Sequence, residues 1–197
     1  DGKFRIKAKR LRGVMSQGLL VPVPDHYNVG DDVTEYFGVT RYVPPADMEN
    51  GADDVTHGPP DRGVKYDIES WFKYKNLLVP GEAVIVTEKI HGTNARFTFQ
   101  DDKMWAASRT FYRTDTQNSL YWKVLKDNPQ IEEFCRRYPG VILYGEIYGW
   151  VQNLKYGANQ GQIWFRAFDV YDKGTYWNWG RFELAMSEFN IPVVPIL

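Results

Sequence analysis

Hydrophobic and polar positions alternate at the start of the chain. In the run Lys3-Phe-Arg-Ile-Lys-Ala-Lys, charged and apolar residues take turns, which predicts a strand with one solvated face. Residues 10–24 continue as short β segments separated by Gly and Pro. Together they predict a small barrel-like β element. Residues 44–66 are polar and rich in Gly, Pro and Asp, which indicates a linker or a long loop.

The pattern changes at Gly81, where longer apolar segments begin. Apolar runs and alternating faces predict strands at residues 83–89, 94–99, 103–109, 141–149, 163–171 and 191–197, with a turn at residues 91–93. Helical spacing predicts a helix over Ser119–Tyr138, interrupted at Pro129, and another over Phe182–Phe189. Strands outnumber helices and do not alternate with them regularly. The fold class is therefore predicted to be α+β and not a doubly wound parallel sheet.

Composition places few limits on function. The chain has 197 residues, 43% hydrophobic and 25% charged, as in ordinary globular proteins. Aromatic residues make up 16%, which we assign first to the core, although rings also stack on bases. The net charge of -1 neither favours nor excludes a nucleic-acid partner, but residues 1–12 are basic and residues 25–54 are acidic.

The single cysteine, Cys135, cannot form an internal disulfide, so we expect an intracellular compartment, cytoplasmic or nuclear. Its place in a predicted helix favours a packing role. No apolar run approaches the ~20 residues that a membrane span needs. One Cys and three scattered His are too few for a structural zinc site.

Lys89 is the main candidate for chemistry. It ends a predicted apolar strand just before Gly92, and a lysine becomes a nucleophile when its surroundings lower the pKa of its amine. Taken alone, this placement fits a lysine at the end of an edge strand better than a catalytic one. The sequence has no P-loop motif and neither of the H-R-D and D-F-G motifs of protein kinases.

Companion motifs change this interpretation. The segment Thr87-Glu-Lys-Ile-His-Gly-Thr-Asn resembles motif I of the covalent nucleotidyltransferases in the K-x-H-G-x-N form typical of RNA ligases. Further segments resemble, in order, motif Ia (107–110), motif III (143–149) and motif IIIa (165–170), and residues 149–157 are similar to the connector of phage-type nick-sealing RNA ligases. The resemblance implies an ATP-grasp-like nucleotidyltransferase domain of antiparallel sheets with flanking helices.

The N-terminal segment Lys9-Arg-Leu-Arg-Gly-Val-Met-Ser-Gln-Gly-Leu resembles RNA ligases of the Deinococcus and Naegleria type, which place an OB-like module before the catalytic domain. This implies three parts. Residues 1–45 would be the remnant of an N-terminal OB-like β module, residues 46–80 a linker region, and residues 81–197 an adenylylation domain that is incomplete at its C-terminal end.

The resemblance also implies an activity, ATP-dependent RNA ligation for RNA repair. Lys89 would attack the α-phosphate of ATP and hold AMP, which then passes to a 5′-phosphate end that a 3′-OH seals. Arg109 and Asn94 would contact phosphate groups, and His91 would bind the departing pyrophosphate. Glu146 would accept a hydrogen bond from a ribose hydroxyl or orient metal-bound water.

Three further residues are placed by the same comparison. Phe168 would stack on adenine, although a core position is nearly as well supported, and Glu88 would lie beside the base. Phe165 would share the face of Phe168 only on an irregular strand, because an offset of three breaks the period of two. A Mg²⁺ or Mn²⁺ ion would be held mainly by water and phosphate oxygen, with no protein ligand beyond orientation by Glu146.

Motif IV (a Glu-Gly strand) and motif V (K-x-K) do not follow motif IIIa before Leu197. We therefore expect the chain to be part of a longer protein and to take up AMP poorly by itself. The partner would be RNA ends in a nicked duplex, with no membrane, and the protein a monomer. Alternatives are a DNA ligase, a GTP-using capping enzyme, an inactive nucleic-acid-binding module, and an unrelated α+β domain; His91 argues against the first two, where Asp is usual.

Overall fold

The computed structural model describes residues 9–11, 14–16, 20–39 and 55–197. They belong to two compact units, Asp1–Met48 and Glu49–Leu197. The strand predicted from residue 3 lies outside the described residues up to residue 8, as do residues 44–54 of the predicted loop.

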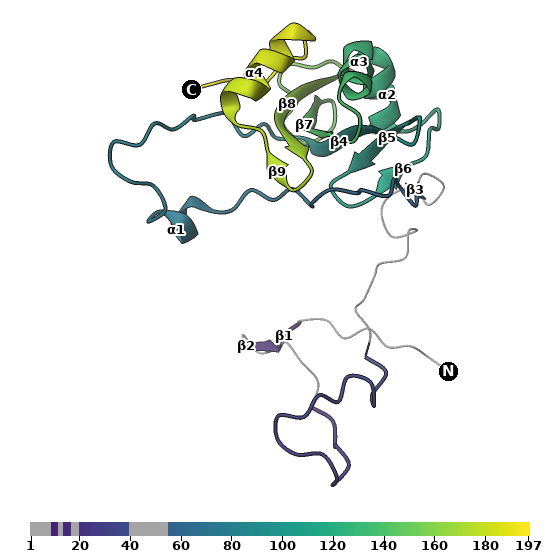
Figure 1. Ribbon diagram of the computed structural model, residues 1–197, viewed down its shortest axis with the longest axis vertical. Helices are drawn as coiled ribbons and strands as arrows, with labels where there is room; N and C mark the ends of the chain where they lie inside the picture. Colours follow the sequence, from purple (N-terminus) through teal and green to yellow (C-terminus); the bar gives the residue numbers. More distant parts are fainter. Residues whose placement is uncertain (1–8, 12–13, 17–19, 40–54) are drawn as a thin grey trace. The chain divides into compact units, whose positions relative to one another are not determined.

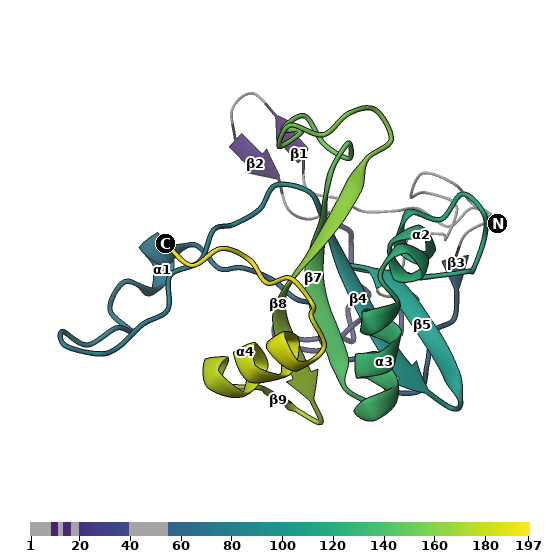
Figure 2. The same ribbon diagram turned by 90° about the horizontal axis from the view of Figure 1, so that it is seen from above.

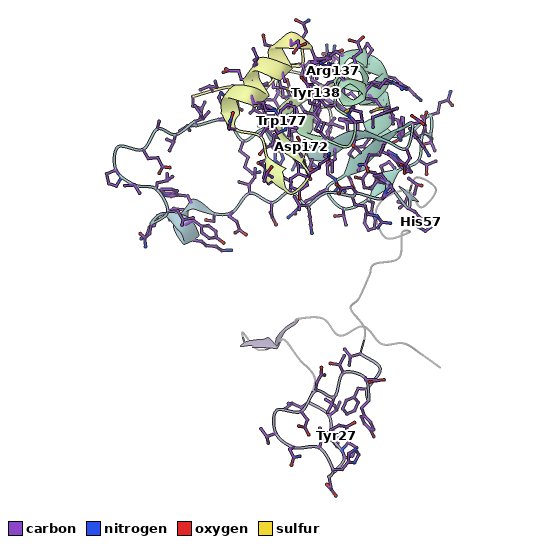
Figure 3. The ribbon with its side chains drawn as sticks, in the orientation of Figure 1. Tyr27, His57, Arg137, Tyr138, Asp172 and Trp177 are labelled. Carbon is purple, nitrogen blue, oxygen red and sulfur yellow. The ribbon has the colours of Figure 1, made fainter. Side chains whose placement is uncertain are left out.

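The first unit contains a short hairpin. Strands β1 (Lys9–Leu11) and β2 (Val14–Ser16) pair antiparallel, so part of the predicted β segment is confirmed. Residues 20–39, in contrast, form turns without a helix or strand. In this segment the ring of Tyr27 (labelled in Figure 3) meets that of Tyr36 edge-on, with centroids 5.5 Å apart.

The second unit is built on a seven-stranded antiparallel sheet (Figure 1) with the order β3-β6-β5-β4-β7-β8-β9. Its strands are β3 (Val55–Thr56), β4 (Thr93–Gln100), β5 (Lys103–Ser108), β6 (Tyr112–Arg113), β7 (Ile142–Gly149), β8 (Ile163–Asp172) and β9 (Thr175–Tyr176). Its helices are α1 (Trp71–Tyr74), α2 (Leu120–Asp127), α3 (Pro129–Arg137) and α4 (Trp179–Glu188). The predicted α+β class is confirmed.

Helices α2, α3 and α4 cover one face of the sheet (Figures 1 and 2). The alternation of β4 sends Phe97 to this face, where it is fully buried beside Phe165. Phe134 of α3 and Phe182 of α4 are also buried in this core. Burial of each such ring contributes about 1.5–3 kcal/mol, and this stabilises the docking of the helices.

The predicted break in the long helix is confirmed. Asn128 separates α2 from α3, and Pro129 begins α3, where a missing N–H and a fixed φ cost nothing. Cys135, on the inner side of α3, is fully buried, and burial raises the pKa of its thiol. The predicted packing role of this cysteine therefore fits the structure.

Residues 61–66 cover part of the opposite face of the sheet. Tyr144 on β7 donates from its hydroxyl to the carbonyl of Val64 at 2.6 Å. The side chain of Gln100 exchanges two hydrogen bonds with the backbone of Asp61. Together with β3, these contacts make part of the segment predicted as a linker a layer of the folded unit.

Two predicted strands are absent. Residues 83–89 form no continuous strand; Thr87 forms a bridge to Ile196, and residues 191–197 contribute this bridge and one from Val193 to Ala167. Val84, Ile85 and Val86 are each about half exposed. An apolar β-branched run favours extended backbone, but a strand also needs a neighbour along its length, and the described residues supply one only for residues 86–88. The described helices include none with the length and hydropathy of a membrane-crossing segment.

Candidate functional site

A cleft of about 350 Å³ lies in the second unit, and side chains from the sheet face that the large helices leave free contribute to it. Its described lining residues are Tyr66, Asp67, Ile68, Thr87, Glu88, Lys89, Ile90, Asn94, Arg109, Glu146, Phe168 and Val194. Six of the seven predicted site residues are among them, since only His91 is missing from this set. Segments far apart in sequence therefore meet in one concave site, as expected for a binding pocket.

The backbone on both sides of Lys89 is fixed, although Lys89 itself is exposed. On one side, the Glu88 N–H donates to the carbonyl of Pro195 at 2.9 Å. On the other side, Ile90 is buried and the Gly92 N–H donates to Glu146 Oε1 at 2.9 Å. The amine of Lys89 is thus carried by a short segment held at three points, and not by the strand that the sequence predicted.

Glu146 reaches this segment from β7. A side chain at position 92 would overlap the carbonyl of Ile147, so glycine permits the close approach that the hydrogen bond to Glu146 requires. Burial raises the pKa of Glu146, while the Gly92 N–H and the charge of Lys89 oppose that shift. The carboxylate and Lys89 line the same cleft.

Asn94 faces Glu146 across the β4–β7 ladder, where their Cα atoms are register partners. Its side-chain oxygen Oδ1 is buried and has no hydrogen-bond partner among the described residues. A buried acceptor without a partner costs about 1–3 kcal/mol. The position therefore suits a ligand that brings a hydrogen-bond donor, such as the hydroxyl of a sugar.

Arg109 directly follows β5, and residues 66 and 67 contact its guanidinium. Its Nε donates to the carbonyl of Tyr66 at 3.2 Å, and its Nη2 lies 2.5 Å from Asp67 Oδ2. The side chain of Arg109 is 44% exposed, so the guanidinium remains accessible to a ligand. Its fork geometry suits an oxyanion such as phosphate.

Phe168 is presented by an irregularity of β8. Tyr144 pairs with Asp169 and Gly145 with Ala167, so Phe168 is an extra residue in the ladder, as in a β-bulge. The bulge lets Phe168 and Asp169 both contact Tyr66: the rings of Phe168 and Tyr66 are 4.8 Å apart, and the Tyr66 hydroxyl donates to Asp169 at 3.1 Å.

Two residues considered from the sequence, and the nearby Arg96, lie elsewhere. Phe165 is in the helix-side core, because the irregularity follows it and leaves its own face unchanged. His91 is exposed, and its backbone N–H donates to the hydroxyl of Tyr156 at 2.7 Å, within the predicted connector. Arg96 is buried and donates to the carbonyls of Ser108 and Arg62.

Sequence reasoning missed Tyr66 and Asp67. Both fall in residues 46–80, whose polar, Gly- and Pro-rich composition predicted a linker. Tyr66 is nevertheless half-buried among the rings of Tyr144, Phe168 and Tyr176. A large aromatic residue inside a polar stretch was the available signal. The described residues contain no group of three or more His, Cys, Asp or Glu that could hold a metal.

Comparisons with known proteins point to the same family as the sequence motifs. The family model described as RNA ligase matches residues 82–197. The protein Early 65 kDa of Autographa californica nuclear polyhedrosis virus is 35% identical over 87 residues, 41% of this chain and 15% of the viral protein.

Solved structures of the Naegleria gruberi RNA ligase are also similar. The structure with PPi has a TM-score of 0.66 at 27% identity, covering 98% of this chain and 61% of that chain. A variant with ATP and Mn gives 0.65 at 26% identity, and a variant with AMP and Mn gives 0.65 at 27% identity, with the same coverage. This chain thus spans about 61% of the length of the ligase structures that it matches. Because the family model covers more than half of its residues, the chain belongs to the RNA ligase family of the nucleotidyltransferase superfamily.

Proposed function

We propose that the cleft around Lys89 is the ATP site of an ATP-dependent RNA ligase and that Lys89 accepts AMP. The observation that carries this proposal is the convergence of six predicted site residues on one cleft of about 350 Å³. That volume is within the range of pockets for small organic ligands. The Naegleria gruberi ligase structures with ATP or AMP and Mn support a nucleotide in the corresponding fold.

In the first step, Lys89 Nζ attacks the α-phosphorus of ATP. An N–P bond forms, the bond from the α-phosphorus to the bridging oxygen breaks, pyrophosphate leaves, and the amine loses a proton. Catalysis of such a step depends on positioning and on cationic groups near the phosphates. The anchored backbone around Lys89 supplies the positioning, and Arg109 supplies a cation at the same cleft.

The nucleoside would be bound by the sheet side of the cleft. Phe168, raised by the bulge, offers a ring for adenine, with Glu88 beside the base. Asn94 Oδ1, buried without a partner among the described residues, would accept a hydrogen bond from a ribose hydroxyl. Glu146 Oε1 is used by Gly92, which leaves Oε2 for a ribose hydroxyl or for water on a Mg²⁺ or Mn²⁺ ion. Such an ion, when bound, neutralises developing charge on the phosphate oxygens.

In the later steps, AMP would move from Lys89 to the 5′-phosphate of an RNA end, and a 3′-OH would then displace AMP. The first of these transfers breaks the N–P bond, forms a bond between the 5′-phosphate and AMP, and regenerates the free amine. In the second, the 3′-OH loses its proton and forms the phosphodiester bond, and AMP leaves. Arg109 is the candidate contact for the 5′-phosphate, because its guanidinium lines the cleft and is exposed. His91 would contribute to binding of pyrophosphate, although it is outside the described lining of the cleft.

The first test is transfer of AMP to the protein. The chain is incubated with ATP labelled at the α-phosphate and Mg²⁺ or Mn²⁺, then denatured, and the bound label is measured. Because motifs IV and V do not occur before Leu197, we expect weak label on the wild type. Lys89→Ala should give only background, because it removes the proposed nucleophile. The matched control is Lys123→Ala, which removes an exposed lysine on α2. Equal labelling of Lys89→Ala and the wild type would contradict the proposal.

A second measurement separates an RNA ligase from a DNA ligase. Nicked duplexes with RNA or with DNA on the 3′-OH side are compared as substrates for sealing. Preference for the RNA 3′-OH supports the proposed class, and equal or better sealing of the DNA strand argues against it.

A further inference from the structure

A second, smaller cleft of about 210 Å³ shares Arg109 with the first. Its described lining residues are Thr56, His57, Arg62, Gly63, Lys65, Arg96, Arg109, Thr110, Phe111 and Tyr112. His57 is labelled in Figure 3, on the side of the unit away from Arg137 of helix α3. The volume is below the range typical for drug-sized ligands, so the cleft suits a small group and not a whole nucleotide.

The lining of this cleft is strongly cationic. Arg62, Lys65, Arg96 and Arg109 all contribute to it, and no Asp or Glu does among the described residues. The two carboxylates next to these residues in sequence are already bound to residues of the cleft. Asp61 accepts the backbone N–H of Gly63 at 2.8 Å, and Asp67 pairs with Arg109.

Arg96 makes the positive charge of the cleft a fixed feature of the fold. It is 4% exposed, and among the described residues its guanidinium is matched only by neutral groups. These include the carbonyls of Ser108 and Arg62, each at 3.0 Å, and the ring of Tyr112 with its centroid at 5.0 Å. A buried charge without a counter-ion acts over a longer range than one in water, so it attracts an anion to the cleft.

Arg62 and Lys65 can respond to a ligand because their side chains are exposed. The backbone of Arg62 is already fixed, since its carbonyl accepts from both Arg96 and Tyr112. The cleft therefore combines a rigid floor with two accessible cations at its rim. Such an arrangement fits an oxyanion that arrives on a flexible chain.

We propose that this cleft binds a backbone phosphate of the polynucleotide strand whose end reacts in the neighbouring site. The assignment rests on the proposed ligase function, and Arg109 connects the two sites because it lines both clefts. A phosphate contact of this kind positions the strand without reading its sequence. The same oxyanion chemistry could belong to the β- and γ-phosphates of ATP, and the experiment distinguishes the two sources.

The test uses Arg62→Ala, Lys65→Ala and the double variant. Alanine at position 62 keeps the carbonyl that Arg96 and Tyr112 use, so the fold is expected to remain. Binding to a fluorescent nicked RNA duplex is measured by anisotropy without ATP, over a range of salt concentrations. We expect affinity to fall about fivefold for each single variant, and the slope of log K against log salt to fall by about 1 in the double variant.

The matched control is Arg137→Ala, which removes an exposed cation from the opposite side of the unit (Figure 3). It should leave both the affinity and the slope unchanged. An equal loss in Arg137→Ala and in Lys65→Ala would overturn the proposal, because binding would then follow net charge alone. Unchanged RNA binding in the double variant would overturn it as well.

A second arm separates RNA from ATP. In the double variant, the ATP concentration for half-maximal labelling should stay within about twofold of the wild type, since no charge facing the first cleft is changed. A tenfold rise in that concentration with unchanged RNA binding would assign the cleft to the ATP phosphates and overturn the proposal. If Lys89→Ala is labelled as strongly as the wild type but the salt slope falls as expected, the proposed ligase function fails and the phosphate site stands.

Discussion

At the residue scale, two residues that the sequence predicted for the candidate site are each held by a residue that it did not predict. Arg109, in motif Ia, is held by Asp67 and by the carbonyl of Tyr66. Phe168, in motif IIIa, contacts Tyr66. The motif residues carry reactive groups, and the segment after residue 60 fixes where two of them point.

The ion pair between Arg109 and Asp67 gives a testable competition. Both side chains are partly exposed, so the pair contributes at most about 1 kcal/mol, and a phosphate would have to displace or share it. We expect Asp67→Asn to lower the ATP concentration for half-maximal labelling of Lys89 by about two- to fivefold. The control is Asp127→Asn, which breaks a similar exposed pair on α2. If Asp67→Asn instead raises the ATP concentration for half-maximal labelling, Asp67 serves mainly to orient Arg109.

Asp169 should make stability depend on pH. Burial raises the pKa of its carboxyl to about 6, although the bonds from Tyr66 and the Val170 N–H oppose that shift. A raised pKa means that the folded state holds the proton more tightly than the unfolded chain. Stability should therefore fall as pH rises from about 4 to about 6. Asp169→Asn removes this titration, so its unfolding midpoint should change less over that interval. An identical pH profile in denaturant titrations of the two proteins would contradict the assignment.

Much of the candidate site could be predicted, but only as a set of residues. Lys89, Arg109, Glu146 and Phe168 follow from ordered motifs, and the structure brings them to one cleft. The support for Lys89 could not be predicted, because it comes from hydrogen bonds to Pro195 and Glu146. Such contacts join segments far apart in sequence and leave no periodic signal.

At the element scale, β8 shows how one strand serves both a core and a site. Phe165 and Ala167 are buried on the helix side, and after the extra residue Phe168 the core position moves to Val170. A regular strand would have kept the period of two and sent Val170 to the opposite face. The bulge therefore maintains the core while it directs Phe168 to the cleft.

Gly145 of motif III should be required for the packing of β7 on β8. A Cβ there would lie 2.6 Å from the carbonyl oxygen of Arg166 and closer still to the ring of Phe165. We expect Gly145→Ala to lower the free energy of unfolding by about 1–3 kcal/mol through overpacking. The control is Gly180→Ala in α4, where the nearest atom is 3.8 Å away and alanine should stabilise by about 0.5–1 kcal/mol. Denaturant melts of both variants measure the difference, and equal effects would contradict the argument.

Element prediction succeeded where a pattern was local and failed where it depended on a neighbour. The helices on either side of Asn128 and the strands β4, β5, β7 and β8 follow from periodicity and from Pro129. Residues 83–89 have the composition of a strand, but among the described residues only 86–88 have a backbone partner, residues 195–197. The short β3, β6 and β9 contain two residues each, too few for any alternation to be visible.

At the scale of the whole molecule, the second unit is a sheet with a different cover on each face. Helices α2, α3 and α4 cover one face, and residues 61–66 cover part of the other (Figures 1 and 2). The α+β class could be predicted from the sequence, whereas the second cover could not, because it has no regular structure. The division into an OB-like remnant, a linker and an adenylylation domain stays a proposal, and β3 places part of that linker in the sheet.

The contacts within the second unit predict that residues 49–197 fold without residues 1–48. The helix-side core draws all its residues from position 95 onward, and the cover of the other face begins after residue 54. We expect the 49–197 fragment to unfold in one cooperative transition with a midpoint within about 4 °C of the whole chain, a shift that corresponds to roughly 1–2 kcal/mol. Circular dichroism during heating measures the transition. A matched fragment that starts at residue 70 loses β3 and residues 61–66, so it should unfold at least about 10 °C lower. If both fragments unfold at the same temperature, the segment before residue 70 contributes no stability, and its role as a structural layer of the unit is wrong.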